Sequence, residues 1–447
     1  MNASQAPRLT EGPVGAHLRD MAMPMVWGLL ATMSFNAVDT LFVAQLGHEP
    51  LAAMSFTFPV VMVLTSIAIG LGAGTSSAVA RAIGADNHHL AQRMATDAMT
   101  LTTIISVVMC GIGLATINPL FTLLGAEPEL LPLIHDYMWI WYFSAPCLMV
   151  PMVGLASLRA MGLARIQGTL MMAAALLNLI LDPLLIFGLF GLPRLELEGA
   201  ALATLITRAL SLVAVIYILH KQLRMLVNPF ASLHEVWVSW RAILHVGVPA
   251  MVNNIIIPLA SGVVVYLVAT YGTVAVAGLG IAMRIEPIAL IVFYALSGVV
   301  GPFCGQNLGA EKYQRLDETL RVMTKFCMLF GVALAAVLWA TGELLIRLFA
   351  DTDAVVDVAR SYLLIVPISY GAYGLVMSVN AAFNGIGQPM PGVAISFLRV
   401  IGLYLPLAWL LQWQWGLTGL FFATGLCNLL VGFVAWLWLR HRFSQLA

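Results

Sequence analysis

The chain has 447 residues, of which 61% are hydrophobic and only 9% are charged, and its mean hydropathy is +0.94. Soluble proteins carry about 25% charged residues, so this composition excludes a soluble globular protein and indicates an integral membrane protein. The 21 basic and 21 acidic side chains balance to a net charge of zero. This balance excludes the basic surface of a nucleic-acid-binding protein, and we expect no nucleic acid partner.

Twelve apolar stretches are each long enough to cross a bilayer, which takes about 20 residues. They are 20–44, 52–80, 94–117, 131–158, 166–190, 199–219, 244–269, 275–304, 321–341, 360–384, 392–411 and 416–439. The links between them are too short to hold a soluble domain. We predict five parts in chain order: an N-terminal segment 1–19, a first lobe 20–219, a linker 220–243, a second lobe 244–439 and a tail 440–447.

The distribution of Lys and Arg between the loops predicts the orientation of the chain. If the N-terminus is cytoplasmic, the opposite side holds only Arg194 and Arg347, with Arg360 at a boundary. The cytoplasmic side then holds fifteen basic residues: Arg8, Arg19, Arg81, Arg93, Arg159, Arg165, Lys221, Arg224, Arg241, Lys312, Arg315, Arg321, Lys325, Arg440 and Arg442. We therefore predict a multi-pass protein of a bacterial inner membrane with both termini in the cytoplasm.

The two halves of the chain repeat each other at an offset of 225 positions. At this offset Pro24 aligns with Pro249, Gly47 with Gly272, and Gly162 with Gly387. Because each half has six predicted helices, the repeats are parallel and related by an axis along the membrane normal. The predicted fold class is an all-α membrane protein of 12 transmembrane helices in two pseudo-symmetric six-helix lobes, which is typical of secondary transporters.

Asp39 is the strongest candidate for a functional charge inside the membrane, where an ionised side chain costs about 2.5–3.5 kcal/mol. Helical spacing places Thr32, Asn36 and Asp39 on one face. The residue that aligns with Asp39 in the second half is Val264, so the packing of the repeat does not require an acid there. The alternative is that Asp39 lies near the outer interface and is simply hydrated.

Asp182 is the second candidate. Asn178 precedes it by one helical turn, and Pro183 follows it, which predicts a kink or hinge. The alternative is a carboxylate at the outer end of a helix that Pro183 terminates. Both acids lie about two-thirds of the way along outward-running helices. If they converge in an apolar cavity, their mutual repulsion suits a site that takes up and releases a proton.

The second half contains Arg284, Glu286 and Arg399 inside predicted spans. Arg284 and Glu286 are two residues apart and do not face each other along a helix. They are secondary candidates that line a cavity or neutralise neighbouring charges, and a structural role is the favoured interpretation.

Several other patterns indicate structure rather than chemistry. The run Gly70-Leu-Gly72-Ala-Gly74 lies inside an apolar helix and lacks the Lys-Ser/Thr of a phosphate loop, so it predicts close helix packing. The five cysteines lack metal-ligand spacing, and His88-His89 lacks partner ligands, so we predict no metal site and no disulfide framework. No catalytic motif occurs, and we do not expect an enzyme. The first 19 residues also lack the apolar core of a signal peptide.

The residues resemble the multidrug and toxic compound extrusion (MATE) transporters over nearly the whole chain. The resemblance rests on Asp39-Thr-Leu-Phe-Val-Ala-Gln-Leu-Gly47 with Leu51-Ala-Ala, on Leu158-Arg159-Ala-Met-Gly162, on Asn178-Leu-Ile-Leu-Asp182-Pro183 and on Gly199-Ala-Ala-Leu-Ala-Thr204. It implies two six-helix lobes forming a V with alternating access. It also implies export of organic cations and amphipathic drugs in exchange for protons or sodium ions. By the matching motifs, Asp39, Asn178, Asp182 and Thr204 carry over as the proton site of the first lobe.

Two departures from the family pattern refine this expectation. The sodium-coupled branch has acids in helices 7 and 10, whereas 248–268 and 362–384 contain none here. This difference favours protons over sodium, and the pairing of the acid with Asn in helix 5 most resembles the DNA-damage-inducible F-like subfamily. Phe35 stands where some relatives have Tyr, and Leu155-Ala-Ser157 precedes the Leu-Arg pair where relatives often have Asn. The hydrogen bonds around Asp39 are therefore expected to be fewer.

The sequence thus predicts a monomeric, proton-coupled multidrug antiporter that needs no cofactor and whose partners are organic cations, amphipathic drugs and membrane lipids. The runner-up is a lipid-linked oligosaccharide flippase of the same superfamily, for which the deep cations Arg208, Arg284 and Arg399 would bind an anionic headgroup. An intramembrane enzyme lacks a catalytic constellation, and a channel fits the unequal charges of the two halves less well.

Overall fold

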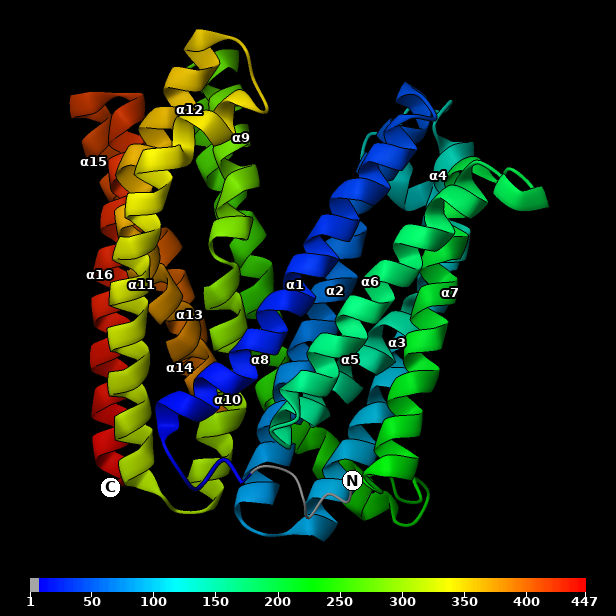
Figure 1. Cartoon of the computed structure of the whole chain (residues 1–447), viewed down its shortest axis with the longest axis vertical. Coiled ribbons are helices and arrows are strands. Elements are labelled where there is room, and N and C mark those ends of the chain that lie inside the picture. Colours follow the sequence, from blue (N-terminus) through cyan, green and yellow to red (C-terminus); the bar gives the residue numbers. More distant parts are fainter. Residues whose placement is uncertain (1–7) are drawn as a thin grey trace. The chain divides into compact units, whose positions relative to one another are not determined.

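A computed structural model describes residues 8–447, and these residues form helices joined by short connections (Figure 1). Residues 1–7 of the predicted N-terminal segment 1–19 lie outside the described residues. The α-helices are α1 (Val14–Ala44), α2 (His48–Gly84), α3 (His88–Leu123), α4 (Leu131–Phe143), α5 (Ala145–Ala160), α6 (Ala164–Ile186), α7 (Glu196–Tyr217), α8 (Leu233–Ala269), α9 (Thr273–Ala289), α10 (Ile291–Gly309), α11 (Tyr313–Arg347), α12 (Asp353–Ile365), α13 (Tyr370–Gly385), α14 (Met390–Phe397), α15 (Leu405–Trp415) and α16 (Leu417–Leu446). Short 3₁₀ or π segments are η2 (Leu189–Gly191), η3 (Ile218–Gln222), η4 (Val366–Ser369) and η5 (Leu398–Tyr404).

The helices confirm the predicted membrane spans. Within residues 8–447, 11 helices or helix runs are long and apolar enough to cross a bilayer, and the pair α4 and α5, bent by 41°, makes up to 12. Several helices extend past the predicted apolar stretch. For example, α8 begins at Leu233 rather than at residue 244, and the additional helical residues include both polar and apolar side chains.

Some predicted spans contain a break. The stretch 275–304 divides into α9 and α10 at Leu290, three residues after Pro287. The stretch 360–384 is interrupted by η4, which contains Pro367. Proline lacks the backbone N–H that an α-helix requires and its ring clashes with the preceding turn, which accounts for the end of α12 at Ile365, before Pro367.

The chain divides into two compact units, each considered by itself. The first unit comprises Met23–Met251, and the second comprises Leu9–Ala22 together with Val252–Ala447. The predicted linker 220–243 therefore belongs to the first unit, and the first turns of α1 belong to the second. In the first unit α2, α3, α5 and α7 pack side by side, and in the second unit α13 packs against α10, α11 and α16.

The glycine run of α2 confirms the prediction of close helix packing. A Cβ atom on Gly74 would lie 2.2 Å from the carbonyl oxygen of Ile243 in α8, and one on Gly70 would lie 2.8 Å from that of Gly247. Gly72 faces α5, where an added Cβ would lie 3.5 Å from the side chain of Ala156. The helix α8 thus approaches α2 to backbone contact, which a side chain at Gly70 or Gly74 would prevent, whereas α5 lies at ordinary van der Waals distance from Gly72.

The second unit holds its N-terminal segment through polar contacts to α10 and α11. Arg315 donates to the carbonyl oxygens of Leu9 (2.9 Å) and Gly12 (2.7 Å), and Lys312 donates to that of Thr10 (2.8 Å). Asn307 accepts from Arg315 and donates to Leu9. The backbone before α1 is therefore fixed on the second unit.

Candidate functional site

The two acids predicted for the first lobe lie in α1 and α6 and are both buried. Asp39 is 8% exposed, five residues before the end of α1, and Asp182 is fully buried, four residues before the end of α6. Both acids thus lie closer to the helix ends than the predicted two-thirds of the span. The helices begin earlier than predicted, at Val14 and Ala164, and α6 ends at Ile186 beside the left-handed Gly188.

Close packing of α1 against α6 brings the acids together. A Cβ atom on Gly28 would lie 3.2 Å from the Cα atom of Gly168, and one on Gly168 would lie 2.3 Å from the carbonyl oxygen of Pro24. Asp39 follows Gly28 by 11 residues, close to three turns, so both lie on one face of α1. Asp182 follows Gly168 by 14 residues, close to four turns of α6. The glycine contact therefore turns both carboxyl groups toward the same helix interface.

The carboxyl groups of Asp39 and Asp182 lie close enough to interact electrostatically with each other. Within residues 8–447, Oδ1 of Asp39 and both carboxyl oxygens of Asp182 have no hydrogen-bond partner. Ionised carboxylates only accept hydrogen bonds, so a bond between the two groups requires that one of them carries a proton. The arrangement can hold a single proton between two acids.

Arg208 of α7 and Tyr137 of α4 complete this cluster, which we call the carboxyl-pair site: Asp39, Asp182, Arg208 and Tyr137. The charges of Arg208 and of both acids act on Tyr137, and Arg208 interacts electrostatically with Asp39. Arg208 also donates to the hydroxyl of Ser144 at 2.7 Å and lies over the ring of Trp141, 5.0 Å from its centroid. The guanidinium therefore has three kinds of partner within the first unit.

The sequence analysis did not assign Arg208 or Tyr137 to the site of the two acids. A signal for Arg208 was present, because a cation in the middle of an apolar helix needs a nearby acid or cavity. Tyr137 carried no such signal, since tyrosine is common in apolar helices.

The remaining residues predicted for the proton site differ in exposure. Asn178 is buried one turn before Asp182, and its carboxamide oxygen has no hydrogen-bond partner within residues 8–447. Thr204 is half-buried, and its hydroxyl donates to the carbonyl oxygen of Ala200. Asn36 is exposed, and its carbonyl oxygen accepts from the hydroxyl of Thr40. Only Asn178 is therefore buried alongside the two acids.

The second unit contains a separate polar cluster around Glu286 of α9. Glu286 accepts hydrogen bonds from the hydroxyl groups of Tyr362 (2.6 Å) and Tyr370 (2.9 Å). Arg399 of η5 lies over the ring of Tyr373, 4.1 Å from its centroid. Arg284, the other secondary candidate, is exposed. Of the two secondary candidates, Glu286 is thus the one that tyrosines hold in place.

Potential metal ligands are dispersed over the described part of the chain. No group of three or more His, Cys, Asp or Glu residues there has the geometry to hold a metal ion. The five cysteines are unpaired, and His88 lies 3.8 Å from Asp86 at the turn before α3.

A protein family and several known proteins are similar to this chain. A family described as MatE matches the chain twice, over residues 24–184 and 249–410. The two matches begin 225 positions apart (249 minus 24), the offset at which the halves of the sequence repeat.

Similar proteins cover almost the whole chain. A protein of Shewanella oneidensis named FAD transporter is 40% identical over 437 residues, which cover 98% of this chain and 96% of that protein. The multidrug export protein MepA of Staphylococcus aureus is 25% identical over 451 residues, 99% of this chain and 98% of that one. A crystal structure of the Vibrio cholerae MATE transporter VcmN has a TM-score of 0.92 at 32% identity and covers 97% of both chains.

Proposed function

Because the chain belongs to the MatE family of multidrug and toxic compound extrusion transporters, we propose that this multi-pass membrane protein is a proton-coupled exporter whose coupling proton binds the carboxyl-pair site. The observation that carries the proposal is the closeness of two buried carboxyl groups that interact electrostatically, with Oδ1 of Asp39 and both carboxyl oxygens of Asp182 lacking a hydrogen-bond partner among residues 8–447. Both acids lie in spanning helices, where an unpaired charge is costly. Binding and release of one proton changes the charge of this cluster by one unit.

The proposed cycle uses this change of charge. A proton that enters from outside neutralises one acid of the pair and lets the two carboxyl groups share a hydrogen bond, so the end of α1 shifts and substrate leaves outward. Release of the proton toward the cytoplasm leaves two like charges close together, which only Arg208 offsets, and the site again favours a cation. Each pH unit of gradient supplies about 1.4 kcal/mol per proton.

We propose protons rather than sodium as the coupling ion. No acid occurs in 248–268 or 362–384, where the sodium-coupled branch has them. Sodium also prefers a shell of several oxygen ligands, whereas the pair in the first unit lies beside the cation Arg208. Sodium independence of transport is the expected result.

For the substrate, we propose flavin adenine dinucleotide as the first molecule to test, because the relative named FAD transporter is 40% identical over 98% of this chain. This molecule combines two flat ring systems with an anionic pyrophosphate. Each unit of the chain offers groups of matching chemistry: Arg208 lies on Trp141 in the first unit, and Arg399 lies on Tyr373 in the second. Aromatic rings favour flat ligands, and guanidinium groups bind phosphate oxygens.

Organic cations and amphipathic drugs are the second candidate class. Full-length similarity to a multidrug export protein and the two acids of the first unit favour them. We further propose a monomer in the bacterial inner membrane with both termini in the cytoplasm, as the loop charges indicate.

The test is transport into inside-out vesicles that contain the full chain and have an acidic interior. We expect accumulation of the flavin, no change on addition of sodium, and a fall of at least about tenfold in Asp39→Asn, because this variant cannot use the gradient. Asp136→Asn removes an exposed acid and serves as the matched control. Gradient-driven transport at the wild-type rate in Asp39→Asn would refute the proton role.

The substrate is decided in the same vesicles. Accumulation of a fluorescent cation without flavin would overturn the first candidate and support the second. If neither is transported, complementation of a flippase-deficient strain tests the lipid-linked oligosaccharide alternative.

A further inference from the structure

The segment between η3 and the middle of α8 exposes large apolar side chains in an otherwise polar part of the chain. Phe230 and Leu233 are each 86% exposed, and Trp237 is 64% exposed. Leu233, Trp237 and Arg241 are spaced four residues apart and therefore form one stripe along the first turns of α8. We call Phe230, Leu233 and Trp237 the apolar stripe.

A neighbouring face of the same turns packs within the first unit. Val236, Ser239 and Ile243 are buried, and Trp240 is partly buried against the core of α2, α3 and α5. Exposure of the apolar stripe is therefore not a sign of an unpacked helix. The helix has its core face filled and presents a second apolar face outward.

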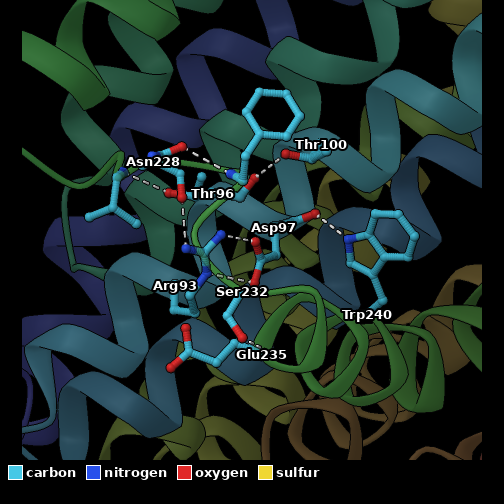
Figure 2. Close-up of polar contacts among 10 residues, drawn as sticks. Arg93, Thr96, Asp97, Thr100, Asn228, Ser232, Glu235 and Trp240 are labelled. Atoms are coloured by element: carbon cyan, nitrogen blue, oxygen red, sulfur yellow. Dashed lines mark hydrogen bonds and ion pairs between the residues drawn. The ribbon is translucent and has the colours of Figure 1, made fainter.

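Polar contacts to α3 fix this segment in place (Figure 2). Arg93 and Asp97 form a buried ion pair, and Arg93 also donates to the carbonyl oxygen of Asn228 at 2.9 Å. The indole of Trp240 donates to the carbonyl oxygen of Asp97 at 2.9 Å, and the backbone N–H of Val227 donates to the hydroxyl of Thr96 at 2.9 Å. The ion pair and these bonds hold both the loop and the helix start.

The length of α8 places the stripe at the edge of the membrane. Its 37 residues extend over roughly 55 Å, whereas the hydrocarbon core is about 30 Å thick. Residues 244–269 alone are long enough to span that core, so Leu233–Ile243 extend beyond it. The stripe continues an exposed apolar surface of the same helix, which includes Val248, Val252 and Leu259. Aromatic residues such as Trp237 are enriched at membrane interfaces.

The charges of the segment complement an anionic surface. Lys221, Arg224 and Arg241 are exposed, whereas Glu235 is the one acid between residues 220 and 243. Basic groups beside apolar side chains are the pattern of a segment that lies in a membrane interface rich in anionic lipids.

We propose that Lys221–Ile243 is an interfacial membrane anchor in which the apolar stripe enters the cytoplasmic leaflet and Lys221, Arg224 and Arg241 bind the headgroups of anionic phospholipids. The occupant of this surface is the lipid bilayer and not a second protein. The inference rests on the proposed cytoplasmic orientation but not on the transported substrate. It assigns the connection between the two repeats a role in membrane attachment in addition to joining them.

The depth of the stripe is tested with a spin label on Trp237→Cys in the full chain, reconstituted in vesicles of mixed zwitterionic and anionic phospholipid. We expect the label to collide more often with oxygen, which partitions into lipid, than with a water-soluble nickel complex. The same label on His89→Cys, in the exposed first turn of α3, should show the opposite preference. Labelling of the unmodified chain measures the background from the native cysteines. Equal nickel access at both positions would overturn the proposal and leave a soluble partner as the alternative.

The lipid preference is tested by native mass spectrometry of the same protein after extraction with anionic phospholipid. The double variant Arg224→Gln with Arg241→Gln should lose affinity for that lipid by about fivefold for each removed charge. Arg194→Gln with Arg347→Gln, on the predicted outer side, removes the same number of exposed arginines and should leave retention unchanged. Equal retention by both double variants would refute the headgroup contacts.

Discussion

At the scale of single residues, the first unit places two acids and one arginine where each would be costly alone. With one proton on the pair, Arg208 and the remaining carboxylate cancel, and the cluster is neutral. Without the proton, it carries one net negative charge in an apolar surrounding. A buried cluster whose charge depends on a single proton suits the coupling step of an exporter.

The two acids are predicted to act as one unit. Asp39→Asn and Asp182→Asn should each abolish gradient-driven transport, and the double variant should be no worse than either single variant. The reason is that removal of one member already prevents a shared proton, so the effects do not add. Transport rates of the four proteins at equal expression measure this. Losses that multiply in the double variant would mean that the acids act independently.

At the scale of helices, glycines decide which helices approach closely. Gly28 and Gly168 bring α1 to α6, and Gly70 and Gly74 bring α2 to α8. The first contact aligns the carboxyl-pair site, and the second joins the start of α8 to the core of the first unit. In a bilayer, packing of this kind replaces the hydrophobic driving force that is absent between helices surrounded by lipid.

Gly74→Ala should therefore destabilise the protein. Its Cβ would lie 2.2 Å from the backbone oxygen of Ile243, which cannot move without displacing α8, and overpacking of this kind costs about 1–3 kcal/mol. Gly111→Ala in α3 is the matched control, because an added Cβ there meets no atom within 4 Å. Thermal unfolding in detergent should show a lower Tm for Gly74→Ala only. An equal Tm for both variants would contradict the packing argument.

At the scale of the whole molecule, each unit fixes the chain segment that precedes a spanning helix. In the second unit Arg315 holds the backbone before α1, and in the first unit Arg93 holds the loop before α8. The repeats thus share a principle of construction, although Arg93 and Arg315 are 222 positions apart and do not align at the offset of 225. In both units a cation on a helix satisfies carbonyl groups of irregular backbone.

Arg315→Gln should release the segment before α1 without unfolding the second unit. The variant loses the guanidinium bonds to Leu9 and Gly12, so amide hydrogen exchange over residues 9–14 should become faster. Arg321→Gln removes an exposed arginine of the same helix and should leave exchange unchanged. Unchanged protection in Arg315→Gln would show that apolar burial of Leu9 and Val14 alone holds the segment.

The sequence alone determined the membrane class, the twelve spans, the internal repeat and the two acids, because each depends on residue type and spacing along the chain. Apolar length defines a span, and the cost of a charge in lipid marks Asp39 and Asp182 wherever they lie. The partners of these acids were decided by tertiary structure: Arg208 and Tyr137 come from α7 and α4, and only the packing of four helices brings them together. Tertiary structure also decided the direction of the apolar stripe in the linker. The stripe points outward because Arg93, paired with Asp97 on α3, binds the backbone of this segment.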